Sequence, residues 1–206
     1  MNKKQQKLGK IIAKLKKLFP QTKTALNYST AWELLVAVIL SAQCTDKTVN
    51  KVTEKLFKKY KTLDNYANAR QKEFEQDIRS TGFYRNKAKN ILASAKLIRD
   101  KYIGKIPNTM EQLLKLPGVA RKTANIILYL VHGKIEGVAV DTHVRRLSKL
   151  YGLTDNDDPI KIEKDLMAII PKKEWMDFTF RMIDYGRAYC PAHPHNHANC
   201  PLTKIT

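Results

Sequence analysis

The sequence has few acidic residues, and the deficit is largest near its start. Its 206 residues include 38 Lys and Arg but only 19 Asp and Glu, which gives a formal net charge of +19. Residues 1–32 contain no acidic side chain, whereas basic residues recur from Lys3 to Lys204. A distributed basic excess indicates a polyanionic partner, and nucleic acid ranks before a membrane. A basic proteome or a need for solubility is the alternative explanation of the charge alone.

Cysteines and long apolar runs are also scarce. The three cysteines, Cys44, Cys190 and Cys200, are too few for a disulfide framework. The longest apolar run, Leu34 to Leu40, is far shorter than the roughly 20 residues that span a bilayer. Lysines interrupt the apolar residues near the start, so we expect no signal peptide and a cytoplasmic protein.

The first segment has the pattern of a basic amphipathic helix. Leu8, Ile11, Leu15 and Phe19 fall on one helical face, lysines occupy the others, and Pro20 ends the pattern. Such a helix is typical of membrane-surface binding or of a transit peptide. The favoured interpretation is an ordinary docking helix with a hydrated basic face.

Helical signals continue along the whole chain, so we predict an all-α fold. A capping box at Thr30-Ala31-Trp32-Glu33 precedes a very apolar helix, Trp32 to Ala42. Helical spacing continues from Thr45 to Lys61 and in a short helix from Phe74 to Arg79. Asp158-Pro159 starts another helix by the usual order of cap and proline.

A tight turn, Leu116-Pro117-Gly118-Val119-Ala120, separates two helical patterns. Pro117 fixes one backbone angle, and Gly118 is able to take a positive φ or to lie close to a phosphate. The second helix would begin at the turn, and backbone N–H groups at such a helix start attract anions. Arg121 and Lys122 add positive charge at the same edge.

Together with the later segment Val140-Asp141-Thr142-His143, this turn resembles the helix-hairpin-helix and catalytic segment of the endonuclease III family of DNA glycosylases. Ala120 replaces a glycine that is usual in that family, and a methyl group is tolerated there if the backbone angle is ordinary. The resemblance implies a two-lobed all-α fold. A six-helix barrel would span residues 24–134, with its helix-hairpin-helix at about 109–130. Residues 1–23 and 135–206 would form the second helical domain.

The resemblance also implies an activity. The expected protein is a monomeric bifunctional DNA glycosylase and AP lyase of base excision repair, associated with the nucleoid. Its expected partner is double-stranded DNA with damaged bases, specifically oxidised pyrimidines, or with abasic sites. Lys122 would be the nucleophile that forms a Schiff base with the sugar, and it must be neutral when it attacks. Asp141 would stabilise positive charge on the opening sugar or assist proton transfer.

Each catalytic residue also has a simpler interpretation. Lys122 has the position of a phosphate-binding lysine, and Asp141 has that of a helix N-cap. Two other functions therefore stay open, a monofunctional glycosylase and a non-catalytic helix-hairpin-helix DNA-binding protein. Adenine-removing glycosylases of the superfamily lack a lysine at the position of Lys122, which favours the lyase.

Further residues are expected at the DNA by the same resemblance. Gln43 would enter the duplex near the damaged base, and Phe83 would be the apolar wedge that fills the gap left by a flipped base. The simpler interpretation of Phe83 is a surface aromatic packed on a neighbouring helix. The remaining expected DNA contacts are Leu116, Gly118, Ala120, Arg121, His143 and Arg145.

The C-terminal loop, residues 190–206, departs from the family pattern. The family typically has four cysteines there, spaced Cys-x6-Cys-x2-Cys-x5-Cys, which bind a [4Fe–4S] cluster. Those positions hold Cys190, His197, Cys200 and Thr206. Two thiolates are too few for an ordinary cluster, so we predict that the cluster is lost and expect no cofactor. A zinc site formed by Cys190, His193, His197 and Cys200 is a weaker alternative to a degenerate loop held by packing.

Overall fold

The computed structural model describes residues 3–205. The regular secondary structure of these residues is helical, with no β-strand. The all-α prediction is confirmed. The chain divides into two compact units. The first, unit A, comprises the chain up to Thr24 and from Ile135 onward, and the second, unit B, is Ala25–Lys134. None of the helices among the described residues is long and apolar enough to cross a membrane.

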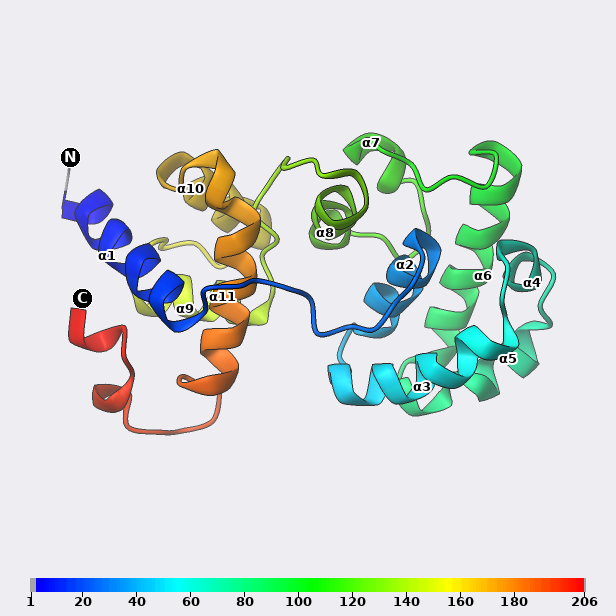
Figure 1. Cartoon of the computed structure of the whole chain (residues 1–206), viewed down its shortest axis with the longest axis horizontal. Coiled ribbons are helices and arrows are strands. Elements are labelled where there is room, and N and C mark those ends of the chain that lie inside the picture. The colour runs from blue at the N-terminus through cyan, green and yellow to red at the C-terminus, as the bar shows by residue number, and fades with distance from the viewer. Residues whose placement is uncertain (1–2, 206) are drawn as a thin grey trace. The chain divides into compact units, whose positions relative to one another are not determined.

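Unit B is built around one very apolar helix, which lies among its other helices (Figure 1). This helix, α2, covers Ala31–Leu40, and every side chain from Leu34 to Leu40 is buried. A helix without a polar face is stable only when neighbours surround it, and α2 contacts α3, α6 and α8. The bounds of the other unit B helices are α3 Asp46–Lys59, α4 Leu63–Ala67, α5 Gln71–Asp77, η1 Arg79–Thr81, α6 Tyr84–Lys101, α7 Met110–Leu113 and α8 Arg121–His132.

The predicted capping box before α2 is half right. The Thr30 side chain accepts a hydrogen bond from the Glu33 N–H, as expected of an N-cap. The Glu33 carboxylate, however, accepts from the N–H of Ser29 at 2.6 Å. The two residues still satisfy two N–H groups at the helix start. The helix also ends two residues earlier than predicted, because residues 41–44 form a turn.

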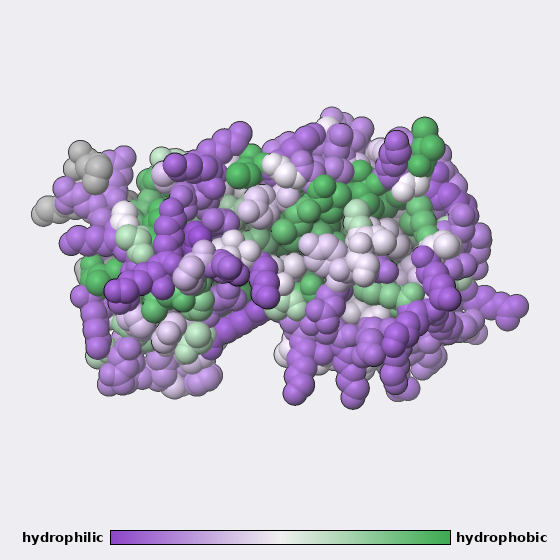
Figure 2. All heavy atoms as spheres, viewed as in Figure 1, coloured by the Kyte–Doolittle hydropathy of each residue, from purple (hydrophilic) through white to green (hydrophobic). Residues whose placement is uncertain are grey.

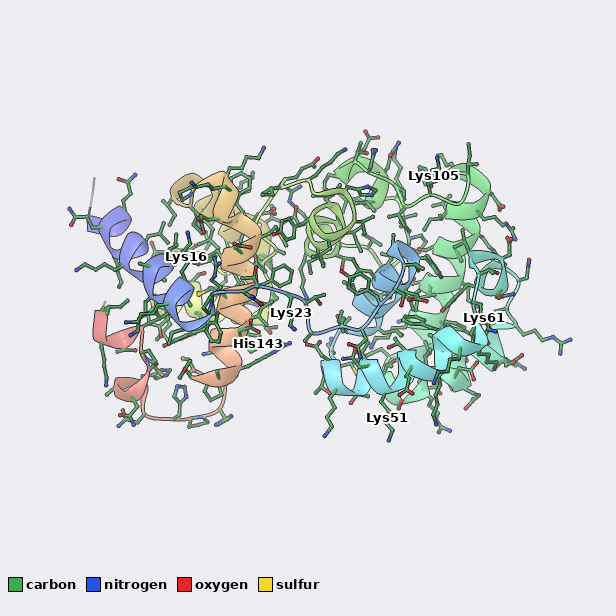
Figure 3. The ribbon with its side chains drawn as sticks, in the orientation of Figure 1. Lys16, Lys23, Lys51, Lys61, Lys105 and His143 are labelled. Carbon is green, nitrogen blue, oxygen red and sulfur yellow. The ribbon has the colours of Figure 1, made fainter. Side chains whose placement is uncertain are left out.

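Unit A joins the first helix to the C-terminal third of the chain. Its helices are α1 Lys3–Leu18, α9 Thr142–Leu150, α10 Pro159–Ile169, η2 Lys172–Glu174, α11 Trp175–Ala188, η3 His197–Asn199 and η4 Thr203–Ile205. Helix α1 lies beside α11 (Figure 1). Leu8, Ile11 and Leu15 are buried in the core of this unit, and Lys16 pairs with Glu174 at 2.6 Å (Figure 3). The docking-helix interpretation of the first segment is confirmed, since its apolar face is used inside the unit.

Hydrophilic side chains cover most of the visible surface of unit B along α3 (Figure 2). Lys51, an exposed residue of α3, lies at this surface (Figure 3). The longest apolar side chains left exposed in the described part of this unit lie in turns or at helix ends, including Phe83 and Leu114.

Candidate active site

The hairpin between α7 and α8 is held in place by α6. The N–H of Val119 donates to the carbonyl of Leu116 at 3.1 Å and closes the turn. The Ser94 hydroxyl of α6 donates to the carbonyl of Pro117 at 2.9 Å. Gly118 has a φ of +80°, and an added Cβ would lie 2.9 Å from the Cβ of Asn90. A glycine is therefore required here both by the backbone angle and by the close approach of α6.

The backbone angle of Ala120 is ordinary. Its φ of −95° and ψ of 172° lie in the extended region that any residue adopts. Ala120 is the N-cap of α8, and no side-chain cap hydrogen bond closes this helix start. Its methyl group is thus accommodated in place of the glycine usual in the family.

The hairpin side chains divide into buried and accessible ones. Leu116 is buried with 2% of its surface exposed, so it packs inside the hairpin and is not available to contact DNA. Gly118 and Ala120 are exposed. Arg121 and Lys122 are half-buried and occupy the first two positions of α8.

The two loops that carry Gln43 and Phe83 share one anchor. Both residues have positive φ values, 52° for Gln43 and 47° for Phe83, which non-glycine residues rarely adopt. The Lys87 ammonium group donates to the carbonyl of Leu40 at 2.8 Å and to that of Thr81 at 2.7 Å. These carbonyls lie three residues before Gln43 and two before Phe83. Lys87 therefore ties together the two segments that lead into the predicted DNA-inserting residues.

Lys87 was not predicted as a functional residue. The sequence places it on the same basic helix as Lys89 and Lys96, but it is 4% exposed, and its burial lowers the pKa of the amine. Two carbonyls must satisfy its donors because water does not reach it. No short motif signals this role, since the accepting carbonyls come from segments distant in the sequence.

Phe83 is 63% exposed at the N-terminus of α6. An aromatic ring packed on a neighbouring helix would be largely covered, so the simpler interpretation of Phe83 does not match its exposure. Gln43 is likewise exposed, in the turn that follows α2.

The predicted residues of unit A lie at the start of α9. Asp141 is the N-cap of this helix, and its Oδ1 accepts from the N–H of Val144 at 2.8 Å. His143 lies against α11 (Figure 3), where a Cβ added at Gly186 would come within 2.3 Å of its Nδ1. Arg145 is exposed and lies 3.6 Å from a carboxylate oxygen of Asp157.

Four metal-ligating side chains converge in the loop after α11. Cys190, His195, His197 and Cys200 each place one ligand atom within 4.8 Å of all the others. Burial raises the pKa of the Cys200 thiol, and the neighbouring Cys190 raises it further. The closeness of the four ligand atoms allows the group to hold a metal ion, but this group is not the one expected from spacing. His195 takes the place predicted for His193, because Pro191 and Pro194 make the segment irregular. The fourth expected position, Thr206, lies outside the described residues.

The comparisons with known proteins agree with this architecture. The sequence model of the HhH-GPD superfamily base excision DNA repair proteins matches residues 36–172. The endonuclease III of Synechocystis sp. is 48% identical over all of this chain and 94% of its own length. That of Bacillus subtilis is 45% identical over 93% of this chain and 88% of its own.

The chain belongs to the HhH-GPD superfamily of base excision DNA repair proteins. A structure of a trapped endonuclease III–DNA covalent intermediate superposes with a TM-score of 0.93 at 46% identity, covering 100% of this chain and 96% of that one. A thermostable thymine-DNA glycosylase shares the fold at 22% identity, with a TM-score of 0.80. The protein is a DNA glycosylase and AP lyase of base excision repair, homologous to endonuclease III.

Proposed function

We propose that Lys122 is the Schiff-base nucleophile of this enzyme and that Asp141 assists it. The observation that carries the proposal is the likeness to the trapped covalent endonuclease III–DNA intermediate, at 46% identity over the whole chain. Lys122 has a suitable position, because it lies in the first turn of α8 beside a hairpin whose glycine and helix start suit a phosphate. The expected partner is double-stranded DNA with damaged bases or abasic sites.

The proposed reaction has two bond-breaking steps. The Lys122 amine attacks the sugar carbon that bears the damaged base, and the bond from this carbon to the base breaks. The released base takes up a proton, and the opened sugar forms a Schiff base with Lys122. Loss of a proton from the adjacent sugar carbon then drives β-elimination, in which the bond to the 3′ phosphate breaks. Water hydrolyses the Schiff base and frees Lys122.

Asp141 serves two purposes in this proposal. One carboxylate oxygen caps α9 by accepting from Val144, which fixes the side chain at the helix start. The carboxylate charge then stabilises the positive charge that develops on the sugar, or accepts a proton from it. Gln43 and Phe83 would enter the duplex at the site of the flipped base.

The proposal also covers the preferred lesion, the oligomeric state, the cellular location and the metal cluster. We infer oxidised pyrimidines as the preferred lesions, an inference that rests on the family resemblance. A monomer acting at the bacterial nucleoid is consistent with the basic charge of +19 and with the bacterial relatives. The [4Fe–4S] cluster would be lost, because the described C-terminal loop offers two thiols where such a cluster needs four.

Borohydride trapping tests the nucleophile. The wild type, Lys122→Gln and Lys115→Gln would each be mixed with duplex DNA carrying an abasic site or an oxidised pyrimidine. Lys115 is a matched control, since it is an exposed hairpin lysine paired with Glu111. We expect a covalent protein–DNA product from the wild type and from Lys115→Gln, and none from Lys122→Gln.

The variant Asp141→Asn separates the catalytic role from the cap. Asparagine is as good an N-cap as aspartate, so the melting temperature should stay close to that of the wild type. Loss of the charge should lower the rate of base release by about 10²-fold or more. A covalent product that still forms with Lys122→Gln would overturn the assignment of Lys122 as the Schiff-base nucleophile.

A further inference from the structure

Two pairs of side chains in the four-residue group after α11 are spaced like the ligands of a single metal ion. The Sγ of Cys190 lies 3.6 Å from the Nδ1 of His197, and the Nε2 of His195 lies 3.3 Å from the Sγ of Cys200. Zinc binds thiolates at about 2.3 Å and imidazoles at about 2.0–2.1 Å, so tetrahedral ligands lie about 3.3–3.8 Å apart. Both measured distances match edges of such a tetrahedron.

The same donors do not suit an iron–sulfur cluster. A [4Fe–4S] cluster takes four thiolates, each on a different iron, but the described loop has only Cys190 and Cys200. A two-iron cluster with His₂Cys₂ ligands places both histidines on one iron and both cysteines on the other. In this loop the cysteines are not set apart from the histidines, because all four ligand atoms fall within 4.8 Å of one another, with Cys190 beside His197 and Cys200 beside His195.

One hydrogen bond orients His195 for a cation, while the Cys200 thiol donates to the carbonyl of Tyr189 at 3.1 Å. The Nδ1 of His195 lies 2.9 Å from the carbonyl of His193, and a carbonyl only accepts, so Nδ1 carries the proton. In the neutral ring that binds a metal, Nε2 would then present its lone pair toward Cys200. Metal-binding histidines usually have this arrangement, in which the second nitrogen donates to a carbonyl or carboxylate.

Arg146 of α9 supports the other side of the group. One of its guanidinium nitrogens lies 3.6 Å from the Sγ of Cys190, and another donates to the Cys190 carbonyl. These two contacts fix the position of Cys190 against α9. Both cysteines are buried, at 0% and 1% exposure, whereas His197 is exposed and leaves a route for an ion to enter.

We propose that Cys190, His195, His197 and Cys200 bind one Zn²⁺ ion tetrahedrally. Binding would release the two thiol protons to solvent. Four protein ligands leave no open coordination position, so the ion has a structural role and takes no part in the reaction at DNA. It would fasten the loop, whose only described helices are the three-residue η3 and η4, to α9 and α11. This inference goes beyond the proposed function and is independent of Lys122.

Metal analysis of the purified protein tests the inference. The wild type, Cys200→Ser, His195→Ala and His193→Ala would be produced in medium containing both zinc and iron. Elemental mass spectrometry should find about one zinc ion per chain in the wild type and in His193→Ala. His193 is the matched control, because it is exposed and outside the ligand group. The zinc content should fall at least fivefold in Cys200→Ser and in His195→Ala.

Replacement by cobalt gives a second measurement that depends on wild-type protein alone. Zinc-depleted protein reconstituted with Co²⁺ should show the intense visible absorption of a tetrahedral site and the charge-transfer band of thiolate ligands, and added zinc should abolish both. Iron with acid-labile sulfide in the wild type would overturn the inference in favour of a cluster. Folded wild type that takes up neither zinc nor cobalt would overturn it in favour of a metal-free loop.

Discussion

Lys87 shows how one buried side chain controls two exposed loops. Its ammonium group is the common donor to the carbonyls of Leu40 and Thr81, which precede Gln43 and Phe83. Both of these residues hold left-handed backbone angles, and such angles persist only where the surroundings fix them. The position of Lys87 therefore matters for the geometry of the loops as much as for the stability of unit B.

The substitution Lys87→Met should lower both stability and activity. It keeps much of the side-chain volume but leaves two buried carbonyls without a donor, at a cost of about 3 kcal/mol in the free energy of unfolding. Misplaced loops should lower the rate of base release by on the order of tenfold to a hundredfold. Chemical denaturation and single-turnover assays at a temperature where the variant is folded would measure the two effects.

Lys89→Met is the matched control, since Lys89 lies two residues further along α6 and is exposed. It should leave stability within about 0.5 kcal/mol of the wild type. If Lys87→Met lost stability yet released bases at the wild-type rate, the residue would be structural only, with no influence on the loops.

At the scale of elements, Gly118 lies just before α8 and Gly133 just after it, and the two glycines have similar backbone conformations. Both adopt left-handed angles, with φ of 80° and 65°, but only Gly118 faces a neighbour. A Cβ at Gly118 would meet Asn90, while a Cβ at Gly133 would meet nothing within 4 Å. The left-handed backbone conformation of an alanine at either position should therefore lower the free energy of unfolding by a similar amount, about 1–2 kcal/mol.

Gly118→Ala should be the more damaging of the two alanine variants. The clash with α6 adds to the backbone cost and displaces the hairpin, so we expect a lower melting temperature than for Gly133→Ala and at least tenfold weaker binding to abasic-site DNA. Gly133→Ala should keep wild-type DNA affinity. Thermal unfolding and fluorescence anisotropy would provide the comparison. Equal DNA affinities for the two variants would show that the hairpin does not position DNA.

The elements were largely predictable from sequence because their signals are local. A few neighbouring residues suffice to predict the N-caps Asp141 and Asp158, the very apolar α2 and the turn at Gly118. The burial of Lys87 and the ligand role of His195 were not predictable. Lys87 depends on carbonyls brought together by folding, and His195 depends on how a loop with two prolines turns. The roles of Lys122 and Asp141 rest on the family resemblance, since spacing alone gives only a phosphate site and a cap.

At the scale of the whole molecule, the net charge of +19 affects the rate of encounter with DNA, whereas the phosphate contacts set how steeply the affinity depends on salt. Net charge raises the rate of encounter with any DNA. Only the basic groups that neutralise phosphates release counterions, and each steepens the plot of log affinity against log salt by about 0.9. The slope therefore reports the number of phosphate contacts, and substitution of most of the 38 basic residues should leave it unchanged.

Two single-charge variants with the same net charge separate these consequences. Arg121→Gln removes a half-buried charge at the start of α8, and Lys10→Gln removes an exposed charge from α1, whose apolar face is buried inside unit A. We expect Arg121→Gln to make the salt slope shallower by about one and Lys10→Gln to leave it unchanged. Anisotropy titrations on abasic-site duplex over a range of salt concentrations would measure both. Equal changes in slope would mean that the basic surface binds DNA diffusely, and that the hairpin is not the place where the backbone is held.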